Sequence, residues 1–417
     1  MKITYLHQYF TTSNMSGGTR SYEFARRLVN MGHDVNMITS WREPHHNKDW
    51  FVTNESGITT HWLPIPYSNH MTYMHRMKAF LSFAWQSALK AKSLEADIIF
   101  ASSTPLTIAL PSVYAARKKK VPLVFEVRDL WPQVPIAMKI LKNPLFCFMA
   151  NRLEFWAYKN ANSIVALSPK MKQEIVKKNV NPNNIAVIPN CSDLEDYKFD
   201  KNLSVKFRNE RPWLMNNPLF IYAGTFGKVN NLSYAIKLAK ALKNQNSKIR
   251  ILLIGDGIEK KSLINEAKVC GVLGKNLFFE NQIQKKQMNN YFSAADMCAN
   301  FVIDIKETWA NSANKFFDSL AAGKPIFLNH GGWMQDLVSN YNCGLCMSGK
   351  DINIVAKELD IAMNDTEWLR SAGNSAKKLA IKFFDRNVLA RQLEEVLVTT
   401  QKGKPELVEK IAKGIYI

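Results

Sequence analysis

The chain has 417 residues, of which 47% are hydrophobic and 22% charged, and its formal net charge is +20. One hydrophobic core rarely serves so long a chain, so we expect two globular domains, and the composition excludes a largely disordered protein. The positive charge requires an anionic partner, for which nucleic acid, acidic lipid headgroups and a phosphorylated substrate are the candidates.

The sequence also bears on where the protein works. No uninterrupted apolar segment approaches the ~20 residues that span a bilayer. The first residues, MKITYLHQYF, lack the basic start and the long apolar core of a signal peptide. The six cysteines are scattered and lie mostly in apolar runs, which is typical of reduced thiols. We therefore expect a cytoplasmic protein that does not span a membrane.

One cysteine pair has the C-x-x-C spacing of a zinc or redox site. Cys343 and Cys346 have no second Cys/His pair at zinc-ligand spacing and no thioredoxin-like strand before them. We interpret them as two small residues of a buried strand. The sequence also lacks a D-x-D pair that would hold a metal and a diphosphate, so we expect no metal.

The chain begins with a strand, glycine turn, helix and strand. Residues 2–7 form an apolar run, Gly17 and Gly18 close the following loop, residues 21–33 have a helical period, and residues 34–40 form the next strand. Such a βαβ unit predicts a parallel sheet, whose ligands bind at the carboxyl ends of the strands. The two glycines would let backbone amides approach a phosphate. A plain tight turn explains them equally well, because the G-x-G-x-x-G fingerprint is absent.

Charged residues follow a later strand of the same series. We expect buried strands at residues 98–102 and 123–127, and the second leads into EVRDLWP. Glu126, Arg128 and Asp129 would then reach the same carboxyl-end edge as the glycine loop. Surface decoration is the competing interpretation.

Two segments interleave basic and aromatic residues at helical spacing. They cover residues 71–92 and 136–159, and a basic run at 117–120 lies between them. This pattern suits helices that lie on an anionic membrane surface. Alternatively, the apolar members belong to the core and the lysines are simply solvated.

A second α/β series follows a polar stretch. Between residues 197 and 218 the strand and helix pattern lapses, which predicts a domain boundary. A strand at 219–223 then meets a glycine turn with Gly224 and Lys228, and the strand at 250–254 repeats the pattern. From about residue 351 onward the chain is expected to be helical.

The stretch NSANKFFDSLAAGKPIFLN predicts a loop, a short helix, a turn and a buried strand. Asn311 and Ser312 suit the N-cap, and Gly323 suits the end of the helix. A helix N-terminus that carries a lysine, here Lys315, is a natural anion site. A carboxylate one turn deeper, Asp318, suits a diol such as ribose. An ordinary amphipathic helix is the competing interpretation.

Several motifs occur in one order along the chain: GGTRSYEFARRL, EVRDLWP, IPNCSD, YAGTFGKVNN, LLIGDG and SANKFFDSLAAGKP. In this order the chain resembles the retaining family-4 glycosyltransferases over essentially its whole length. The resemblance is to the branch that builds bacterial O-antigen, capsule and lipopolysaccharide, including transferases of N-acetyl-L-fucosamine.

The resemblance implies the α/β GT-B fold, in which two doubly wound Rossmann-like domains face a central cleft. Residues 1–205 would form the acceptor-binding domain and residues 206–385 the nucleotide-sugar-binding domain. Residues 386–417 would be C-terminal helices that pack back toward the N-terminal domain.

The resemblance also assigns roles to individual residues. Lys228 and Lys315 would stabilise the donor diphosphate, and Asp129 would act on the acceptor side of the catalytic centre. Asp318 would bind the ribose, and Ile283 would meet the base through backbone groups. Further donor contacts are implied for Gly17, Gly18, Gly224, Thr225, Ser312 and Asn314, and acceptor-side contacts for Arg20, Glu126 and Arg128.

The chain departs from the family pattern at several positions. The family's E-x7-E pair falls on Ala310 and Asp318, so the first carboxylate is missing, and Glu307 or Asp304 would have to replace it. The usual arginine and lysine of the second-domain loop are Thr225 and Asn230, which leaves the phosphate charge to the two lysines. Cys191 replaces the glycine of the PNG turn.

We expect a metal-independent, retaining transferase without a cofactor, in which the leaving phosphate accepts the acceptor's proton. The donor would be a UDP-linked, N-acetylated sugar, and the acceptor a saccharide on undecaprenyl diphosphate. The enzyme would be peripheral on the anionic inner face of the plasma membrane, and nucleic acid is not an expected partner. The alternatives are an inactive GT-B membrane scaffold and a two-domain nucleotide-sugar epimerase or oxidoreductase. The last would need a dinucleotide fingerprint and a catalytic Tyr or His.

Overall fold

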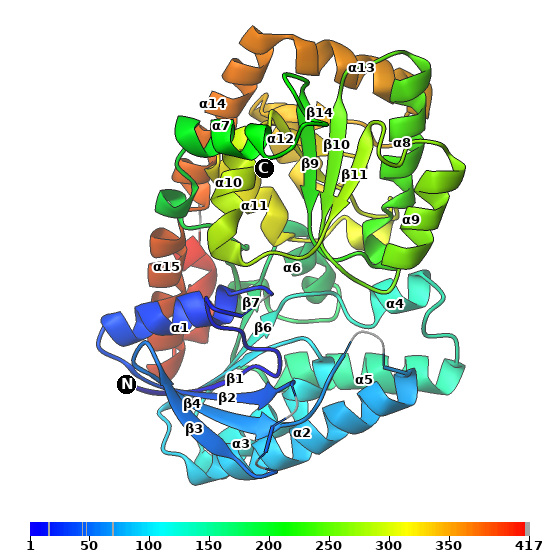
Figure 1. Cartoon of the computed structure of the whole chain (residues 1–417). Coiled ribbons are helices and arrows are strands. Elements are labelled where there is room, and N and C mark those ends of the chain that lie inside the picture. Colours follow the sequence, from blue (N-terminus) through cyan, green and yellow to red (C-terminus); the bar gives the residue numbers. More distant parts are fainter. Residues whose placement is uncertain (16, 44, 47, 69–70, 413–417) are drawn as a thin grey trace. The chain divides into compact units, whose positions relative to one another are not determined.

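The computed structural model describes residues 1–15, 17–43, 45–46, 48–68 and 71–412, and it divides into two compact α/β units (Figure 1). Unit 1 comprises residues 1–189 and 310–312 together with the described residues from Asn387 onward. Unit 2 comprises residues 190–309 and 313–386.

The first boundary lies at residues 189 and 190, before the position near 205 that the polar stretch indicates. The polar stretch contains a helix, α7 (Lys201–Asn209), which packs on α10 (Met288–Ala294) of unit 2. Arg208 of α7 donates hydrogen bonds to the Ala294 carbonyl and to the Asp296 carboxylate. These contacts, and not a composition change, place the segment in unit 2.

Unit 1 is built on an eight-stranded sheet in the order β3-β4-β2-β1-β5-β6-β7-β8. All neighbouring strands are parallel except β3 and β4. The strands are β1 (Lys2–Leu6), β2 (Asp34–Trp41), β3 (Phe51–Glu55), β4 (Ile58–Pro64), β5 (Ile98–Ser102), β6 (Leu123–Val127), β7 (Ser163–Ala166) and β8 (Ile185–Val187). The parallel sheet predicted from the βαβ pattern is confirmed, whereas the hairpin of β3 and β4 lies outside the predicted strands.

Helices cover both faces of this sheet. Leu6 and Phe125 of the sheet share one hydrophobic cluster with Phe83 of α2, Val113 of α3 and Tyr158 of α5. The helices of unit 1 are α1 (Arg20–Asn30), α2 (Tyr73–Ser93), η1 (Leu106–Ile108), α3 (Ala109–Lys119), α4 (Gln133–Ala137), α5 (Pro144–Asn160), α6 (Pro169–Val176), η2 (Pro182–Asn184), α15 (Arg386–Gln401) and η7 (Pro405–Ala412).

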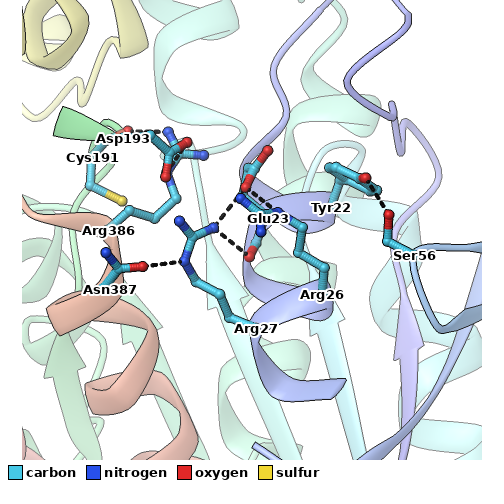
Figure 2. A network of polar contacts seen from close by, with 9 residues as sticks. All are labelled: Tyr22, Glu23, Arg26, Arg27, Ser56, Cys191, Asp193, Arg386 and Asn387. Atoms are coloured by element: carbon cyan, nitrogen blue, oxygen red, sulfur yellow. Dashed lines mark hydrogen bonds and ion pairs between the residues drawn. The ribbon is translucent and has the colours of Figure 1, made fainter. Parts of the chain in front are cut away.

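The C-terminal helix α15 is tied to α1 inside unit 1. Arg27 of α1 donates to the Asn387 side chain at 2.9 Å and is paired with Glu23 at 2.7 Å (Figure 2). Beyond the end of α1, His33 lies 3.1 Å from the Glu394 carboxylate. The chain from residue 387 therefore completes unit 1.

Unit 2 contains a six-stranded, fully parallel sheet in the order β11-β10-β9-β12-β13-β14. Its strands are β9 (Leu219–Ala223), β10 (Arg250–Ile254), β11 (Leu277–Glu280), β12 (Met297–Asn300), β13 (Ile326–Leu328) and β14 (Gly344–Cys346). Besides α7 and α10, its helices are η3 (Leu194–Tyr197), η4 (Lys228–Asn230), α8 (Ser233–Asn244), α9 (Lys260–Val269), η5 (Lys285–Gln287), η6 (Lys306–Thr308), α11 (Asn314–Ala321), α12 (Trp333–Asn340), α13 (Ile352–Asn364) and α14 (Thr366–Phe383).

The strand order reverses once in each sheet, at β1 and β5 in unit 1 and at β9 and β12 in unit 2. The loops that leave two neighbouring strands at such a point run in opposite directions and leave room for a ligand outside their carboxyl ends. This topology directs attention to the residues that follow β1, β5, β9 and β12.

The C-x-x-C pair lies at β14, but the prediction of two residues within a buried strand holds only in part, because the strand itself is half-buried. Cys343 precedes the strand and is fully buried, Cys346 ends it, and both thiols are free. Burial raises the pKa of Cys343 to about 12, so the thiol is unreactive at neutral pH. Within the described ranges no group of three or more His, Cys, Asp or Glu is placed to hold a metal ion. Over the same ranges, none of the helices combines the length and apolarity needed to cross a membrane.

Candidate functional site

Glycine allows the turns that follow β9 and β10 to pack closely against each other. The Gly224 amide donates to the Ile254 carbonyl at 3.0 Å, and the Phe226 amide donates to the Asp256 carbonyl at 2.8 Å. Gly255 has φ +152°, and a Cβ on it would lie 1.9 Å from the Gly224 carbonyl oxygen. Since only glycine permits this approach, the LLIGDG motif fixes the shape of the turn after β9.

Lys315 of α11 reaches this turn. Its Nζ lies 3.0 Å from the Tyr222 hydroxyl and 2.7 Å from the Asn230 side-chain oxygen, and 4.4 Å from the centre of the Tyr222 ring. The Tyr222 hydroxyl donates to the Thr225 carbonyl, so its oxygen accepts from the lysine. Burial lowers the pKa of Lys315 to about 7, and the described contacts of this ammonium include no carboxylate. An unneutralised cation therefore stands beside a glycine turn.

The helix that carries Lys315 starts later than predicted. Its N-cap is Ala313, which offers no side-chain hydrogen bond, and the prediction of Asn311 and Ser312 as caps is wrong. Residues 310–312 belong to unit 1, where the Ser168 hydroxyl donates to the Ala310 carbonyl at 2.8 Å. This packing holds the chain out of the helix until residue 314. The first turn of α11 thus has no side-chain cap for its backbone amides, which suits an anion.

Asp318, one turn further along α11, accepts a hydrogen bond from the Ser192 hydroxyl. Ser192 belongs to the IPNCSD motif, whose neighbouring residues are fixed by Arg386. The Arg386 guanidinium donates to the Cys191 carbonyl at 2.7 Å and lies 3.4 Å from the Asp193 carboxylate (Figure 2). The motif thus supports one oxygen of the Asp318 carboxylate.

The position of the missing family carboxylate is apolar. Ala310 is 3% exposed and belongs to the hydrophobic cluster of unit 1. Of the two replacements considered, Asp304 accepts hydrogen bonds from the Trp309 ring nitrogen, the Gly331 amide and the Ser348 hydroxyl. Partial burial opposes them, but these bonds hold the pKa of Asp304 below its usual value. Asp304 therefore fixes the loop after β12, and Glu307 is exposed.

The remaining donor-side residues of unit 2 lie around the same strand ends. Thr225 and Lys228 are exposed in the turn after β9, and Asn314 opens α11 and is half-buried. Ile283 is half-buried between β11 and η5. Ser312 is grouped with unit 1.

In unit 1, two of the expected acceptor-side residues form a buried ion pair. The Arg20 and Glu126 side chains are 2% and 0% exposed and approach to 2.8 Å. Arg20 also donates to the carbonyls of Ile188 and Pro189, at 2.8 and 2.5 Å, and Ser102 donates to Glu126. Because both side chains are inaccessible, the structure gives them a positioning role: they join α1 to β5, β6 and the end of β8.

Arg128 and Asp129 remain accessible to solvent at the end of β6. Arg128 is half-buried, and its guanidinium lies 3.3 Å from the His7 Nε2. Asp129 is exposed and accepts from the Thr104 hydroxyl at 3.2 Å. Gly17 and Gly18 are exposed just before α1, and the Gly18 carbonyl accepts from the Thr11 hydroxyl.

His7 is a residue that the sequence reasoning missed. It follows β1 directly, is 3% exposed, and lies 2.6 Å from the Ser21 hydroxyl through its Nδ1. Burial, with the nearby charge of Arg128, holds the pKa of His7 well below its usual value. Since a guanidinium only donates, the neutral imidazole accepts at Nε2 and carries its proton on Nδ1. Its position directly after the first strand, where ligands of parallel sheets bind, could have identified His7 as a candidate site residue.

Tyr222 and Asn230 were also missed as partners of Lys315. In the sequence, Tyr222 looks like one more apolar residue of the strand that became β9. Asn230 stands where the family usually has a lysine, which by itself indicates a lost phosphate contact. The structure shows that both bind the ammonium of Lys315.

Two family models match the chain. Residues 17–191 match the glycosyl transferase 4-like domain, and residues 205–379 match the glycosyl transferases group 1 domain. The two matches follow each other without overlap and together cover most of the sequence.

Two named relatives are similar over much of their length. WcaI of Escherichia coli (strain K12), whose name assigns it to colanic acid biosynthesis, is 21% identical over 63% of this chain and 67% of its own. The capsular polysaccharide biosynthesis glycosyltransferase CapM of Staphylococcus aureus is 22% identical over 74% of this chain and 78% of its own.

Among solved structures, HepE of Anabaena in complex with UDP-glucose is similar, with a TM-score of 0.71 at 16% identity. The similarity covers 96% of this chain and 100% of that chain. The predicted fold class, GT-B with two doubly wound Rossmann-like domains, is thereby confirmed.

The buried Arg20–Glu126 pair predicts a specific loss of stability. Glu126→Ala leaves the Arg20 guanidinium buried without its carboxylate, and we expect the free energy of unfolding to fall by about 3–5 kcal/mol. Glu358→Ala removes a half-exposed partner of Lys350 and should change it by less than about 1 kcal/mol. Denaturant titration of the two variants measures both values. An equal, small loss for the two would contradict the positioning role.

Proposed function

The chain is a glycosyltransferase that carries a glycosyl transferase 4-like domain followed by a glycosyl transferases group 1 domain, and we propose that it moves a sugar from a nucleoside diphosphate to a lipid-linked saccharide with retention of configuration. The observation that carries the proposal is the unneutralised ammonium of Lys315 beside the Gly224 turn and the uncapped start of α11. These groups suit a diphosphate.

Glycosyl transfer builds negative charge on the leaving diphosphate and positive charge on the sugar. We propose that Lys315, the exposed Lys228 and the first amides of α11 stabilise the diphosphate as the sugar–oxygen bond breaks. The acceptor hydroxyl then bonds to the same face of the sugar carbon, and its proton passes to the departing phosphate oxygen. This sequence retains the configuration at that carbon and uses no covalent sugar–enzyme intermediate.

For the donor we propose a UDP-linked, N-acetylated sugar. HepE, which shares the fold, was solved with UDP-glucose. In this chain, the Asp318 carboxylate supported by Ser192 suits the ribose hydroxyls, and the backbone near Ile283 suits the base. We propose further donor contacts from Asn314, Thr225 and the Gly17–Gly18 loop.

For the acceptor we propose a saccharide on undecaprenyl diphosphate, used in the synthesis of a bacterial surface polysaccharide. The names of WcaI and CapM support this class of product. Asp129 and Arg128 lie at an accessible strand end of unit 1 and suit the acceptor hydroxyl.

A surface of unit 1 supports a place on the inner face of the plasma membrane. Helices α2 and α5 expose large apolar side chains, and Lys78, Arg152 and Lys159 lie on the same two helices. Apolar and basic groups together suit a layer of anionic lipid headgroups. The exposed apolar residues are Met74, Leu81, Trp85 and Leu89 on α2, and Leu145, Phe146, Phe148, Met149 and Phe155 on α5.

The first test removes the phosphate-binding ammonium. Lys315→Ala should lower kcat for sugar transfer by on the order of a hundredfold or more, because the charge that develops on the diphosphate loses its partner. Lys350→Ala, at a half-exposed ion pair of the same unit, is the matched control. Transfer to a membrane lipid extract with a panel of UDP-sugars measures both. Turnover of Lys315→Ala at the wild-type rate would remove this residue from the mechanism.

The pKa of Lys315 predicts how donor affinity depends on pH. In the free protein its ammonium loses its proton as the pH rises through about 7. A bound diphosphate favours the charged form, so binding takes up a proton and UDP affinity should fall as the pH rises from about 7 to about 9. Isothermal titration across this range measures the slope. Lys315→Gln should bind UDP more weakly and with a flatter pH profile, and an unchanged slope would contradict the assignment.

A further inference from the structure

Three neighbouring strands of unit 1, β1, β5 and β6, end beside the point where the strand order of the sheet reverses. His7 follows β1, Ser103 follows β5 and Arg128 follows β6. The Arg128 amide donates to the Ser103 hydroxyl at 3.0 Å, which fixes the backbone of the arginine. Its guanidinium donates to the His7 Nε2 at 3.3 Å. Ligands of parallel sheets bind at such a point, so these contacts lie where a substrate is expected.

The His7 ring is held from its other side by Ser21, in the first turn of α1. The two residues are 3% and 1% exposed, and the His7 Nδ1 lies 2.6 Å from the Ser21 hydroxyl. Because Nε2 accepts from the guanidinium, Nδ1 carries the proton and donates to the hydroxyl. Rotation of the ring would break both contacts, so its orientation and its tautomer are fixed.

Two consecutive residues of the GGTRSYE motif thus hold two residues of the EVRDLWP motif. Arg20 binds Glu126 directly, and Ser21 reaches Arg128 through His7. The first connection ends on side chains that solvent does not reach. The second ends on a half-buried guanidinium, for which the described residues supply no other hydrogen bond or ion pair. The first connection therefore holds the fold, and the second directs a group that can still bind a ligand.

We propose that His7, fixed by Ser21, is a positioning residue that orients the Arg128 guanidinium toward the acceptor saccharide. A neutral imidazole accepts a hydrogen bond from the guanidinium without neutralising its charge. A carboxylate at the same place would form an ion pair, as Glu126 does with Arg20. With the imidazole, the arginine keeps both its charge and its remaining N–H groups for the oxygens of a substrate.

A purely structural contact is the alternative, and it makes a different prediction. Ser103 and β6 already hold the backbone of Arg128, and a half-buried guanidinium can also bind water. Loss of the His7 contact should therefore leave the arginine in place but free its long side chain to change rotamer. A positioning residue then affects the reaction only as long as Arg128 is present, whereas a structural residue affects it in either case.

This inference rests on the proposed function, in which Arg128 is an acceptor-side residue, so one measurement uses the protein without any ligand. Nitrogen NMR of the full chain, with isotope-labelled histidine, reports the protonation of the His7 ring, and His7→Gln assigns the signals by removing them. The ring should be neutral with its proton on Nδ1, and Arg128→Met should shift the Nε2 signal. A proton on Nε2, or an Nε2 signal that Arg128→Met leaves in place, would overturn the proposal.

The second experiment is a double-mutant cycle of His7→Leu and Arg128→Met. Transfer from a UDP-sugar to dilutions of a membrane lipid extract gives an apparent KM for each substrate. Each single substitution should raise the apparent KM for the acceptor about tenfold and leave that for the donor unchanged, because a hydrogen bond to a charged group is lost. His7→Leu should have no further effect in Arg128→Met protein, because it acts through this arginine. Additive effects would refute the positioning role.

Three variants serve as controls for this cycle. His61 is a buried histidine of β4 whose Nε2 lies 3.1 Å from the Asn36 side-chain oxygen, and His61→Leu should leave both KM values unchanged. His7→Gln keeps an oxygen that accepts from Arg128 and should recover most of the acceptor affinity. A KM as high as that of His7→Leu would contradict the hydrogen-bonding role. If His7→Leu does not fold, Ser21→Ala, which removes one hydroxyl, takes its place in the cycle.

The two experiments fail in different ways. If the protein transfers no sugar, the proposed function fails, whereas the spectra still show whether His7 holds Arg128. If sugar is transferred and the cycle is additive, the proposed function stands and the role of His7 falls.

Discussion

The ammonium of Lys315 is held in the interior by a hydroxyl and an amide oxygen and by no carboxylate among the described residues. The candidate donor site of unit 2 is arranged around this ammonium. The Gly224 and Gly255 turns bring the backbone close to the lysine, and the uncapped helix start adds amide donors of the same sign. A buried positive charge without a carboxylate partner contributes little to stability, but it can bind an anionic ligand strongly.

The charged residues at the strand ends of unit 1 have two kinds of surroundings. Arg20 is fully satisfied by Glu126 and two carbonyls, and the pair joins helix and strands without reaching solvent. Arg128, which follows β6, is half-buried, and its guanidinium contacts the neutral His7 ring and no carboxylate among the described residues. A charge whose hydrogen bonds are all satisfied holds the fold, whereas a half-buried guanidinium of this kind can still bind a ligand.

The start of α11 shows how packing sets the geometry of a site. Residues 310–312 are bound into unit 1 through the Ala310 carbonyl, so the helix begins at Asn314 and Lys315 falls in its first turn. A carboxylate at position 310 would be placed in the hydrophobic cluster of unit 1, where alanine is satisfied. The departure from the family pattern at this position therefore agrees with its surroundings, and Asp304 serves the neighbouring loop instead.

The sequence by itself determined the local features of this protein: the strands that became β1, β5, β9 and β13, the glycine turns, and Lys315 and Asp318 near the start of one helix. These follow from periodicity and turn chemistry, which are properties of short segments. Only the tertiary structure decided that Arg20 and Glu126 are buried partners, that Tyr222 and Asn230 bind the lysine, and that the helix begins at Asn314. It also brought His7 to Arg128. Such contacts join residues far apart in the chain, and burial and hydrogen bonding between them depend on the packing of whole layers, which no local pattern encodes.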